Sequence, residues 1–266
     1  MLNKVVVLIG AMLFSLVALP QVSFALGGLE GLPYEFGFQD PVTPVAREMQ
    51  TFHNMLLWII SGITVFVFLL LVFVALRFNE KTNPKPSQTT HNVPLEVIWT
   101  LVPVLILLVI AIPSFRLLYF SDRVANPDLT VKVTGLQWYW TVEYPDNGGI
   151  SFDTRMIPSD EIDTSKGQKR LLSVDNPMVL PVDTNIQFDI TAADVLHSFA
   201  IPAFGIKKDA VPGRMNQTWA RVEKEGTYFG QCSELCGKDH AFMPMEVRVV
   251  SKEAFALWVE EQKKDL

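Results

Sequence analysis

The chain of 266 residues has only two cysteines, which excludes a disulfide-rich scaffold. It also lacks an excess of basic residues, because 22 Lys and Arg stand against 28 Asp and Glu, a formal net charge of −6. Nucleic-acid binding is therefore not expected, since a phosphate backbone is bound by clustered basic side chains. Hydrophobic residues make up 49% of the chain, which excludes a disordered protein.

Charged residues are scarce in the first 120 residues, which carry 6 basic and 6 acidic side chains against 16 and 22 in the remainder. Residues 55–76 and 97–115 carry no charge at all. Each run is close to the roughly 20 residues that cross a bilayer core as a helix. We therefore expect transmembrane helices at residues 49–77 and 95–119, followed by a polar, acidic domain.

The N-terminus reads as a secretory signal peptide. Lys4 precedes an uncharged run over residues 5–19, and small residues follow up to Ala25. This pattern predicts a signal peptide over residues 1–25, and a third membrane span is the alternative. Export would place residues 26–48 and the acidic domain outside and the loop 78–94 in the cytoplasm, although the positive-inside rule agrees only weakly. The sequence thus predicts a multi-pass protein of a bacterial plasma membrane with a periplasmic domain.

Apolar residues alternate with polar ones from Leu129 onward, and the alternation changes phase at Gly135. A period of two predicts strands, and a glycine at a phase change suggests a bulge or bend. The alternation returns at 186–190 and 245–249, with turn signals between these runs. We expect an all-β sandwich over residues 120–250. A C-terminal helix over residues 251–266, with Ser251 as its N-cap, should follow.

Both cysteines lie in the stretch Cys232-Ser-Glu234-Leu-Cys236-Gly-Lys-Asp-His240-Ala-Phe-Met243, and His197 lies 35 residues before Cys232. Thiolate, imidazole and thioether ligands together select copper. A mononuclear blue-copper site uses two His, one Cys and a weak Met, and this set adds a second cysteine. Two thiolates can bridge two copper ions with one histidine for each, which leaves Met243 and the Glu234 carbonyl as weak outer ligands.

Two other interpretations of the cysteines compete with copper. In an exported domain, two cysteines form a disulfide by default. Zinc is the second alternative, although methionine is a poor zinc ligand. The histidine and methionine at ligand spacing favour copper over both.

The chain resembles subunit II of haem–copper cytochrome c oxidase from about Phe38 onward. The matching stretches are residues 137–140, 151–153, 156–158, 194–198, 209–217 and 230–237. The resemblance implies a two-helix transmembrane hairpin and a cupredoxin-like domain with a binuclear copper centre, called CuA. It also implies that electrons from reduced cytochrome c pass to the haem of subunit I, where oxygen is reduced to water and protons are pumped. Subunit I, subunit III, cytochrome c and membrane lipid are the implied partners.

The resemblance further implies roles for individual residues. The copper ligands map onto the side chains of His197, Cys232, Cys236, His240 and Met243 and onto the backbone carbonyl of Glu234. The Glu234 side chain would also bind a magnesium ion shared with subunit I. Because every ligand position is filled, the quinol-oxidising relatives that lack these ligands are disfavoured.

Three other groups of residues receive roles from the same resemblance. Trp138 matches the tryptophan at which electrons enter, and we expect Trp140 to pack in the core instead. The proposed docking residues for cytochrome c are Glu143, Asp146 and Asp194.

At the cytoplasmic end, Glu96 would open a proton path with His91 at its mouth. The alternative is a carboxylate that merely marks the start of the helix.

Two other functions compete with that of an oxidase subunit, namely a copper-delivery thiol protein and a non-redox membrane receptor. The transmembrane hairpin and the β pattern argue against the copper-delivery protein.

Overall fold

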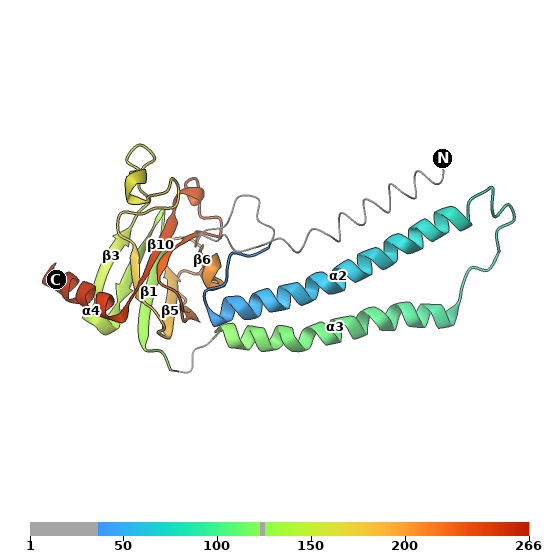
Figure 1. The fold of residues 1–266 in the computed structure, drawn as a ribbon, viewed down its shortest axis with the longest axis horizontal. Helices are drawn as coiled ribbons and strands as arrows, with labels where there is room; N and C mark the ends of the chain where they lie inside the picture. The colour runs from blue at the N-terminus through green and yellow to red at the C-terminus, as the bar shows by residue number, and fades with distance from the viewer. Residues whose placement is uncertain (1–36, 123–125, 266) are drawn as a thin grey trace.

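The computed structural model describes residues 37–122 and 126–265. Two long helices lie side by side and lead into a β domain at one end, and a loop joins them at the other (Figure 1). The predicted signal peptide, residues 1–25, and residues 26–36 of the predicted segment 26–48 lie outside the described residues.

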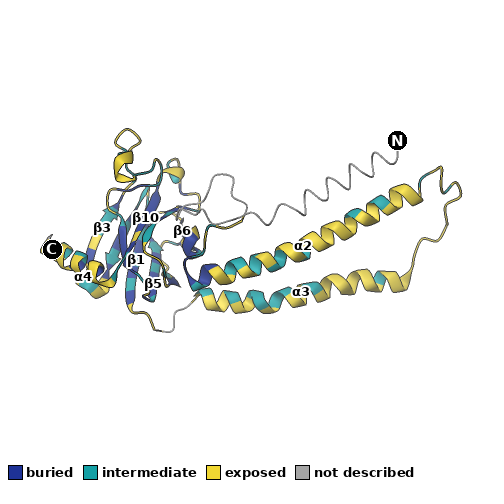
Figure 2. Cartoon of the chain, in the orientation of Figure 1, coloured by how far each residue is buried: buried dark blue, intermediate teal, exposed yellow. Residues whose placement is uncertain are grey.

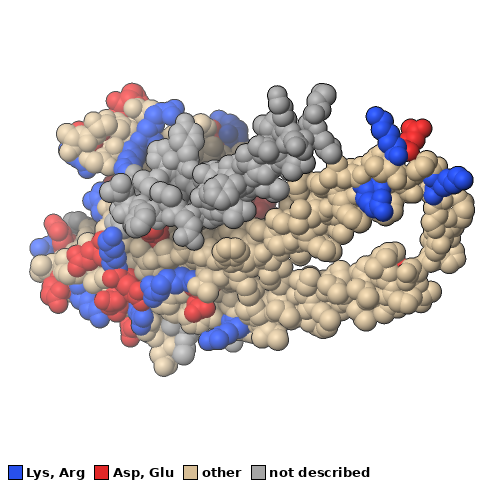
Figure 3. All heavy atoms as spheres, turned by 45° about the vertical axis from the view of Figure 1, so that its right-hand side comes forward, with Lys and Arg blue, Asp and Glu red and all other residues tan. Residues whose placement is uncertain are grey.

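The helices are α2 (Pro44–Arg77) and α3 (Val93–Asp122), and the predicted spans 49–77 and 95–119 lie within them. At 1.5 Å per residue they are about 50 Å and 45 Å long, more than the roughly 30 Å of a bilayer core. Both are long and apolar enough to cross a membrane. Most of their side chains are exposed, and charges gather at the two ends of the hairpin (Figures 2 and 3).

The β domain contains ten strands in three groups. A five-stranded sheet has the order β3-β2-β1-β5-β8, a three-stranded sheet has the order β4-β10-β9, and β6 pairs with β7. The strands are β1 (Leu129–Leu136), β2 (Tyr139–Tyr144), β3 (Ile150–Thr154), β4 (Met178–Pro181), β5 (Ile186–Ala192), β6 (His197–Ile201), β7 (Ile206–Ala210), β8 (Asn216–Ala220), β9 (Gly226–Gln231) and β10 (Pro244–Val250). Large aromatic side chains fill the core between them, among them Trp140, Tyr144, Phe188, Phe199 and Tyr228.

The predicted bulge or bend at Gly135 is wrong. Gly135 lies inside β1, opposite Trp140, and the chain reverses two residues later, so that Leu136 faces Tyr139 across an antiparallel hairpin. The phase of the alternation changes because of this turn. Gly135 is required for another reason, since a Cβ there would come within 2.9 Å of the His197 ring.

The C-terminal helix α4 (Lys252–Gln262) packs on the far side of the β domain from the hairpin (Figure 1). The Ser251 hydroxyl accepts a hydrogen bond from the Ala254 amide, as an N-cap does. Phe255 and Val259 are buried against the core, and Trp258 packs on Tyr144. The predicted N-cap of this helix is therefore present, and the helix buries one apolar face against the domain.

The hairpin is fastened to the β domain at both helices. At α2, the Arg47 guanidinium makes a two-pronged ion pair with Glu223, at 2.6 and 2.9 Å. At α3, the Trp219 indole donates to the carbonyl of Phe120 at 2.8 Å. One contact involves α2 and the other α3, so each helix of the hairpin is joined to the β domain.

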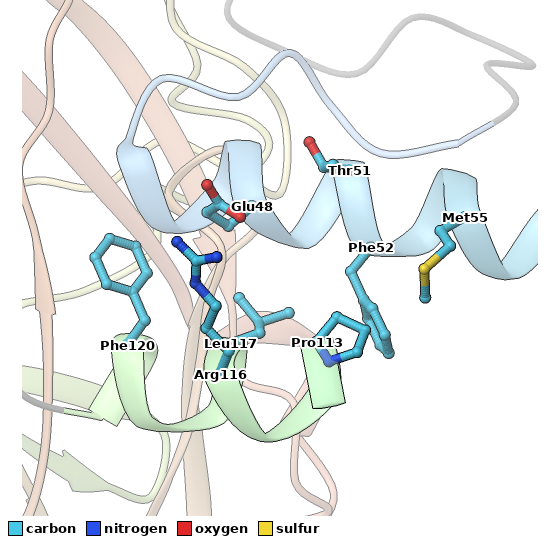
Figure 4. A pocket seen from close by; sticks show the side chains of 8 residues that line it. All are labelled: Glu48, Thr51, Phe52, Met55, Pro113, Arg116, Leu117 and Phe120. Atoms are coloured by element: carbon cyan, nitrogen blue, oxygen red, sulfur yellow. The ribbon is translucent and has the colours of Figure 1, made fainter. Parts of the chain in front are cut away.

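A small cavity of about 270 Å³ separates α2 from α3 close to the β domain (Figure 4). Glu48 and Arg116 face each other across it, but no ion pair joins them within the part of the chain that the structure describes. The remaining lining residues are Thr51, Phe52, Met55, Pro113, Leu117 and Phe120.

Candidate metal centre

The predicted metal ligands come from two neighbouring parts of the β domain. His197 is the first residue of β6. Cys232 directly follows β9, and Met243 directly precedes β10, so the ligand loop connects two antiparallel strands. Because β6 packs against β9, the loop closes over His197 and brings side chains 35 residues apart together.

The donor atoms form one continuous cluster. The Cys232 and Cys236 sulfurs lie 3.9 Å apart. Cys232 Sγ is 3.9 Å from His197 Nδ1, and Cys236 Sγ is 3.5 Å from His240 Nδ1. Each thiol therefore has its own histidine, in the pattern that a two-metal site bridged by thiolates requires.

The weaker donors lie beside the same thiols. Met243 Sδ is 3.5 Å from Cys236 Sγ, and the main-chain oxygen of Glu234 is 3.3 Å from Cys232 Sγ. The Glu234 side chain is exposed to solvent, so its carboxylate is free to face a partner. All six predicted ligands are thus brought together at one place.

The cysteines are free thiols in this structure. A disulfide would need an S–S distance of about 2.05 Å, well below the separation of the two sulfurs. His197, Cys232, Cys236 and Met243 are all buried, and soft sulfur donors with imidazole nitrogen fit copper better than a hard cation. The donor set and its enclosure therefore fit a copper site.

Burial alone would raise the pKa of Cys232, but hydrogen bonds with His197 and with main-chain groups lower this pKa below its ordinary value. Burial and the neighbouring Cys232 charge raise the pKa of Cys236. The pair therefore holds one negative charge more readily than two. Binding of a cation between the sulfurs would favour the second thiolate and release its proton.

The two tryptophans of the β1–β2 hairpin occupy different environments. Trp140 is 1% exposed and packs against His197 and Phe199, so the expectation that it belongs to the core is confirmed. Trp138 is half-buried in the turn, and its indole donates to the carbonyl of Cys236 at 3.2 Å. Of the two, Trp138 connects the ligand loop to the surface.

The three predicted docking carboxylates do not form one group. Glu143 pairs with Lys132 at 2.8 Å, and Asp146 accepts a hydrogen bond from the Thr130 amide. Both lie toward the end of β2 that is remote from Trp138. Asp194 instead lies beside the metal ligands, where it contacts His197 at 2.9 Å.

Glu96 and His91 lie at the opposite end of the hairpin from the metal ligands. Glu96 accepts a hydrogen bond from the Asn92 amide, and the Asn92 side chain accepts one from the Leu95 amide. This reciprocal pair caps the start of α3. The His91 ring contacts the Thr90 hydroxyl at 2.7 Å.

The contacts that three residues make next to the site were not predicted from the sequence. Gly135 makes room for His197, Gln137 donates to the carbonyl of Cys236, and Asp194 accepts from His197. The spacing of Asp194 and His197, three residues apart, is the only sequence signal for the last contact.

A β-sandwich that gathers soft ligands at one loop, mounted on a two-helix membrane hairpin, defines a membrane-anchored protein of cupredoxin-like fold. The family description "Cytochrome C oxidase subunit II, periplasmic domain" matches residues 129–250, and "Cytochrome C oxidase subunit II, transmembrane domain" matches residues 31–117. The chain belongs to the cytochrome c oxidase subunit II family. The predicted fold class, a transmembrane hairpin with an all-β cupredoxin-like domain, is confirmed.

Individual relatives agree with this family. The chain is 50% identical to "Probable cytochrome c oxidase subunit 2" of Rickettsia bellii, over 99% of this chain and 94% of the relative. It is 46% identical to cytochrome c oxidase subunit 2 of Cereibacter sphaeroides, over 85% and 80% of the two chains. The crystal structure of the periplasmic domain of subunit II of cytochrome oxidase from Bradyrhizobium japonicum matches with a TM-score of 0.50 and 55% identity, over 54% of this chain and 99% of that one.

The family defines the role of the chain. It is a component of the haem–copper oxidase complex, in which it is the subunit that receives electrons. It is a membrane protein whose β domain lies outside the membrane, and its partners include other oxidase subunits.

Proposed function

We propose that this subunit accepts single electrons from reduced cytochrome c at a binuclear CuA centre and passes them to the haem of subunit I. The observation that carries the proposal is the pair of buried thiols, 3.9 Å apart, each with its own histidine. Two copper ions that share two thiolates can spread one electron over both metals, which keeps the structural change on reduction small.

The protein holds the ligands in place before any electron arrives. The ligand loop is anchored by the antiparallel β9–β10 pair, and the amide of Ser233 donates to the carbonyl of Ser198, next to His197. We assign the side chains of His197, Cys232, Cys236, His240 and Met243 as copper ligands, and Glu234 as a ligand through its carbonyl. The exposed Glu234 carboxylate is assigned to a magnesium ion shared with subunit I.

Trp138 is the proposed point at which electrons enter. Its half-buried ring can contact a docked partner, and its hydrogen bond to the Cys236 carbonyl provides a short link to the ligand loop. Cytochrome c is the proposed donor, guided to this surface by Glu143, Asp146 and Asp194. Residues 121–266 carry the whole net charge of −6, which favours encounter with a basic partner.

Glu96 and His91 are the proposed entrance of a proton path into subunit I. Their position at the far end of the hairpin from the copper ligands fits a cytoplasmic location when the β domain lies outside. In the proposed topology, the signal peptide 1–25 directs export and the loop 78–94 lies in the cytoplasm. The chain is then a multi-pass protein of a bacterial plasma membrane. Oxygen reduction and proton pumping would take place in subunit I, with subunit III as a further partner.

Rapid mixing of the copper-loaded full chain with reduced cytochrome c tests the proposal. We expect each copper-loaded chain to oxidise one equivalent of cytochrome c rapidly. The Cys232→Ser variant should lose this reaction. Ser233→Ala is the matched control, because Ser233 lies in the same loop and, among the residues that the structure describes, its hydroxyl bonds only the Gln231 carbonyl. Equal oxidation by the wild type and Cys232→Ser would refute the proposed copper centre.

A further inference from the structure

Asp194 uses both oxygens of its carboxylate to bind two separate parts of the proposed copper site. Oδ1 contacts His197 Nε2 at 2.9 Å and accepts the amide of Val195 at 2.6 Å. Oδ2 accepts the main-chain amide of Gln137 at 2.7 Å. The carboxylate is therefore engaged by three donors within the protein.

The contact with His197 determines which nitrogen of that ring is free to bind a metal. His197 is fully buried, and its Nδ1 faces the Cys232 sulfur. A nitrogen that binds a metal must be unprotonated, so the ring proton must reside on Nε2. Asp194 accepts a hydrogen bond from this Nε2–H group, which fixes both the tautomer and the orientation of the ring.

The contact with Gln137 reaches the turn that carries Trp138. The Gln137 side chain donates to the Cys236 carbonyl at 2.8 Å, and the Trp138 indole donates to the same oxygen. A Cβ at Gly237 would come within 3.0 Å of the Trp138 ring, so the turn and the ligand loop are in close contact. The turn is thus fixed to Asp194 on one side and to Cys236 on the other.

We infer that Asp194 is a positioning residue that holds His197 and the Trp138 turn in a fixed relative arrangement. This inference rests on the proposed copper centre and assigns Asp194 a function beyond docking. A docking residue acts through its charge alone, whereas a positioning residue acts through the geometry of its two oxygens. Variants that separate charge from geometry can therefore distinguish the two functions.

Asp194→Asn retains one acceptor oxygen and places an amide group where a second acceptor is needed. Loss of the anionic partner makes His197 a weaker electron donor, so the copper centre should shift to a higher reduction potential. Copper affinity should fall about 10- to 100-fold, as is typical when the partner of a ligating histidine is removed. Asp194→Glu keeps the charge but moves the carboxylate, so it too should change the copper spectrum.

The experiment compares the full chain, loaded with copper in detergent, as wild type, Asp194→Asn, Asp194→Glu and Asp153→Asn. Asp153 is the control, because its carboxylate also accepts surface hydrogen bonds, from Thr141 and Arg155, but contacts no ligand residue. Paramagnetic resonance, redox titration and copper competition are measured for each, together with cytochrome c binding at several salt concentrations.

The inference predicts changed spectra and potentials in both Asp194 variants and none in Asp153→Asn. If Asp194→Asn fails to fold, Asp194→Glu decides the outcome. A wild-type spectrum in Asp194→Glu, with weakened cytochrome c binding as the only defect of Asp194→Asn, would overturn the positioning function. Absence of a binuclear copper spectrum in the wild type would instead refute the copper centre itself.

Discussion

The indole of Trp138 and the main-chain carbonyl of Cys236 are joined by a hydrogen bond of 3.2 Å, across 98 residues of sequence. A half-buried ring at the domain surface is thereby connected to a loop that contains two thiols and a thioether. The ring contacts this loop but offers no ligand atom. Electron uptake and metal binding should therefore be separable at this position.

Trp138→Phe removes the hydrogen bond and part of the aromatic surface. We expect electron uptake from cytochrome c to slow by about tenfold or more, a loss of at least roughly 1.4 kcal/mol in activation free energy. Copper content and spectrum should remain those of the wild type. Stopped-flow mixing measures the first, and unchanged uptake kinetics would refute the assignment of Trp138.

Glu96 can be tested by two substitutions, because its carboxylate caps α3 through the Asn92 amide. Glu96→Gln keeps an acceptor for this amide and loses the charge, whereas Glu96→Ala loses both. A proton-path function predicts slower oxygen consumption in the assembled oxidase for both variants, with copper reduction intact. If only Glu96→Ala is impaired, the residue acts as a helix cap.

Glu143 and Lys132 form an ion pair on neighbouring strands, and both side chains are about one-third exposed. If Glu143 helps to attract cytochrome c, Glu143→Gln should slow the encounter at low salt, and Lys132→Gln should accelerate it. The expected changes are severalfold and should vanish at high salt, because exposed charges are screened. Equal rates for both variants and the wild type would limit this pair to a structural role within the sheet.

Glu223 ties α2 to the β domain. Hydrogen bonds from Arg47 and then Arg221, with their positive charges, lower the pKa of Glu223 from 4.5 to about 2. A carboxyl whose folded-state pKa is depressed stabilises the fold above its unfolded pKa, and this contribution is lost as the pH falls through the folded pKa. The thermal midpoint of the wild type should therefore fall more steeply between about pH 5 and pH 2 than that of Glu223→Gln. Parallel pH profiles would contradict this prediction.

Sequence patterns predicted those features that depend on the kind of residue rather than on its exact neighbours. The two helices follow from uncharged runs, because a lipid environment excludes charge along their length. The ligand loop follows from Cys232, Cys236, His240 and Met243, which are close in sequence. Here the donor types alone limit the choice of metal.

Contacts between distant polar residues could not be predicted in this way. Arg47 and Glu223 are 176 residues apart, and Gln137 and Asp194 are 57 residues apart. Nothing in their local patterns specifies which side chains meet, because that depends on the packing of whole strands and helices. The bulge or bend at Gly135 was wrongly predicted for the same reason. A glycine is needed there because the His197 ring, which is distant in sequence, leaves no room for a Cβ.

The ligand loop and His197 are proposed to hold two copper ions that share one electron. The most direct measurement is the paramagnetic resonance and near-infrared spectrum of the oxidised, copper-loaded full chain, combined with its metal content. A binuclear centre of this kind should give two copper ions per chain and a hyperfine pattern from one unpaired electron spread equally over both nuclei. A single copper ion with a localised electron, or a zinc ion in its place, would contradict it.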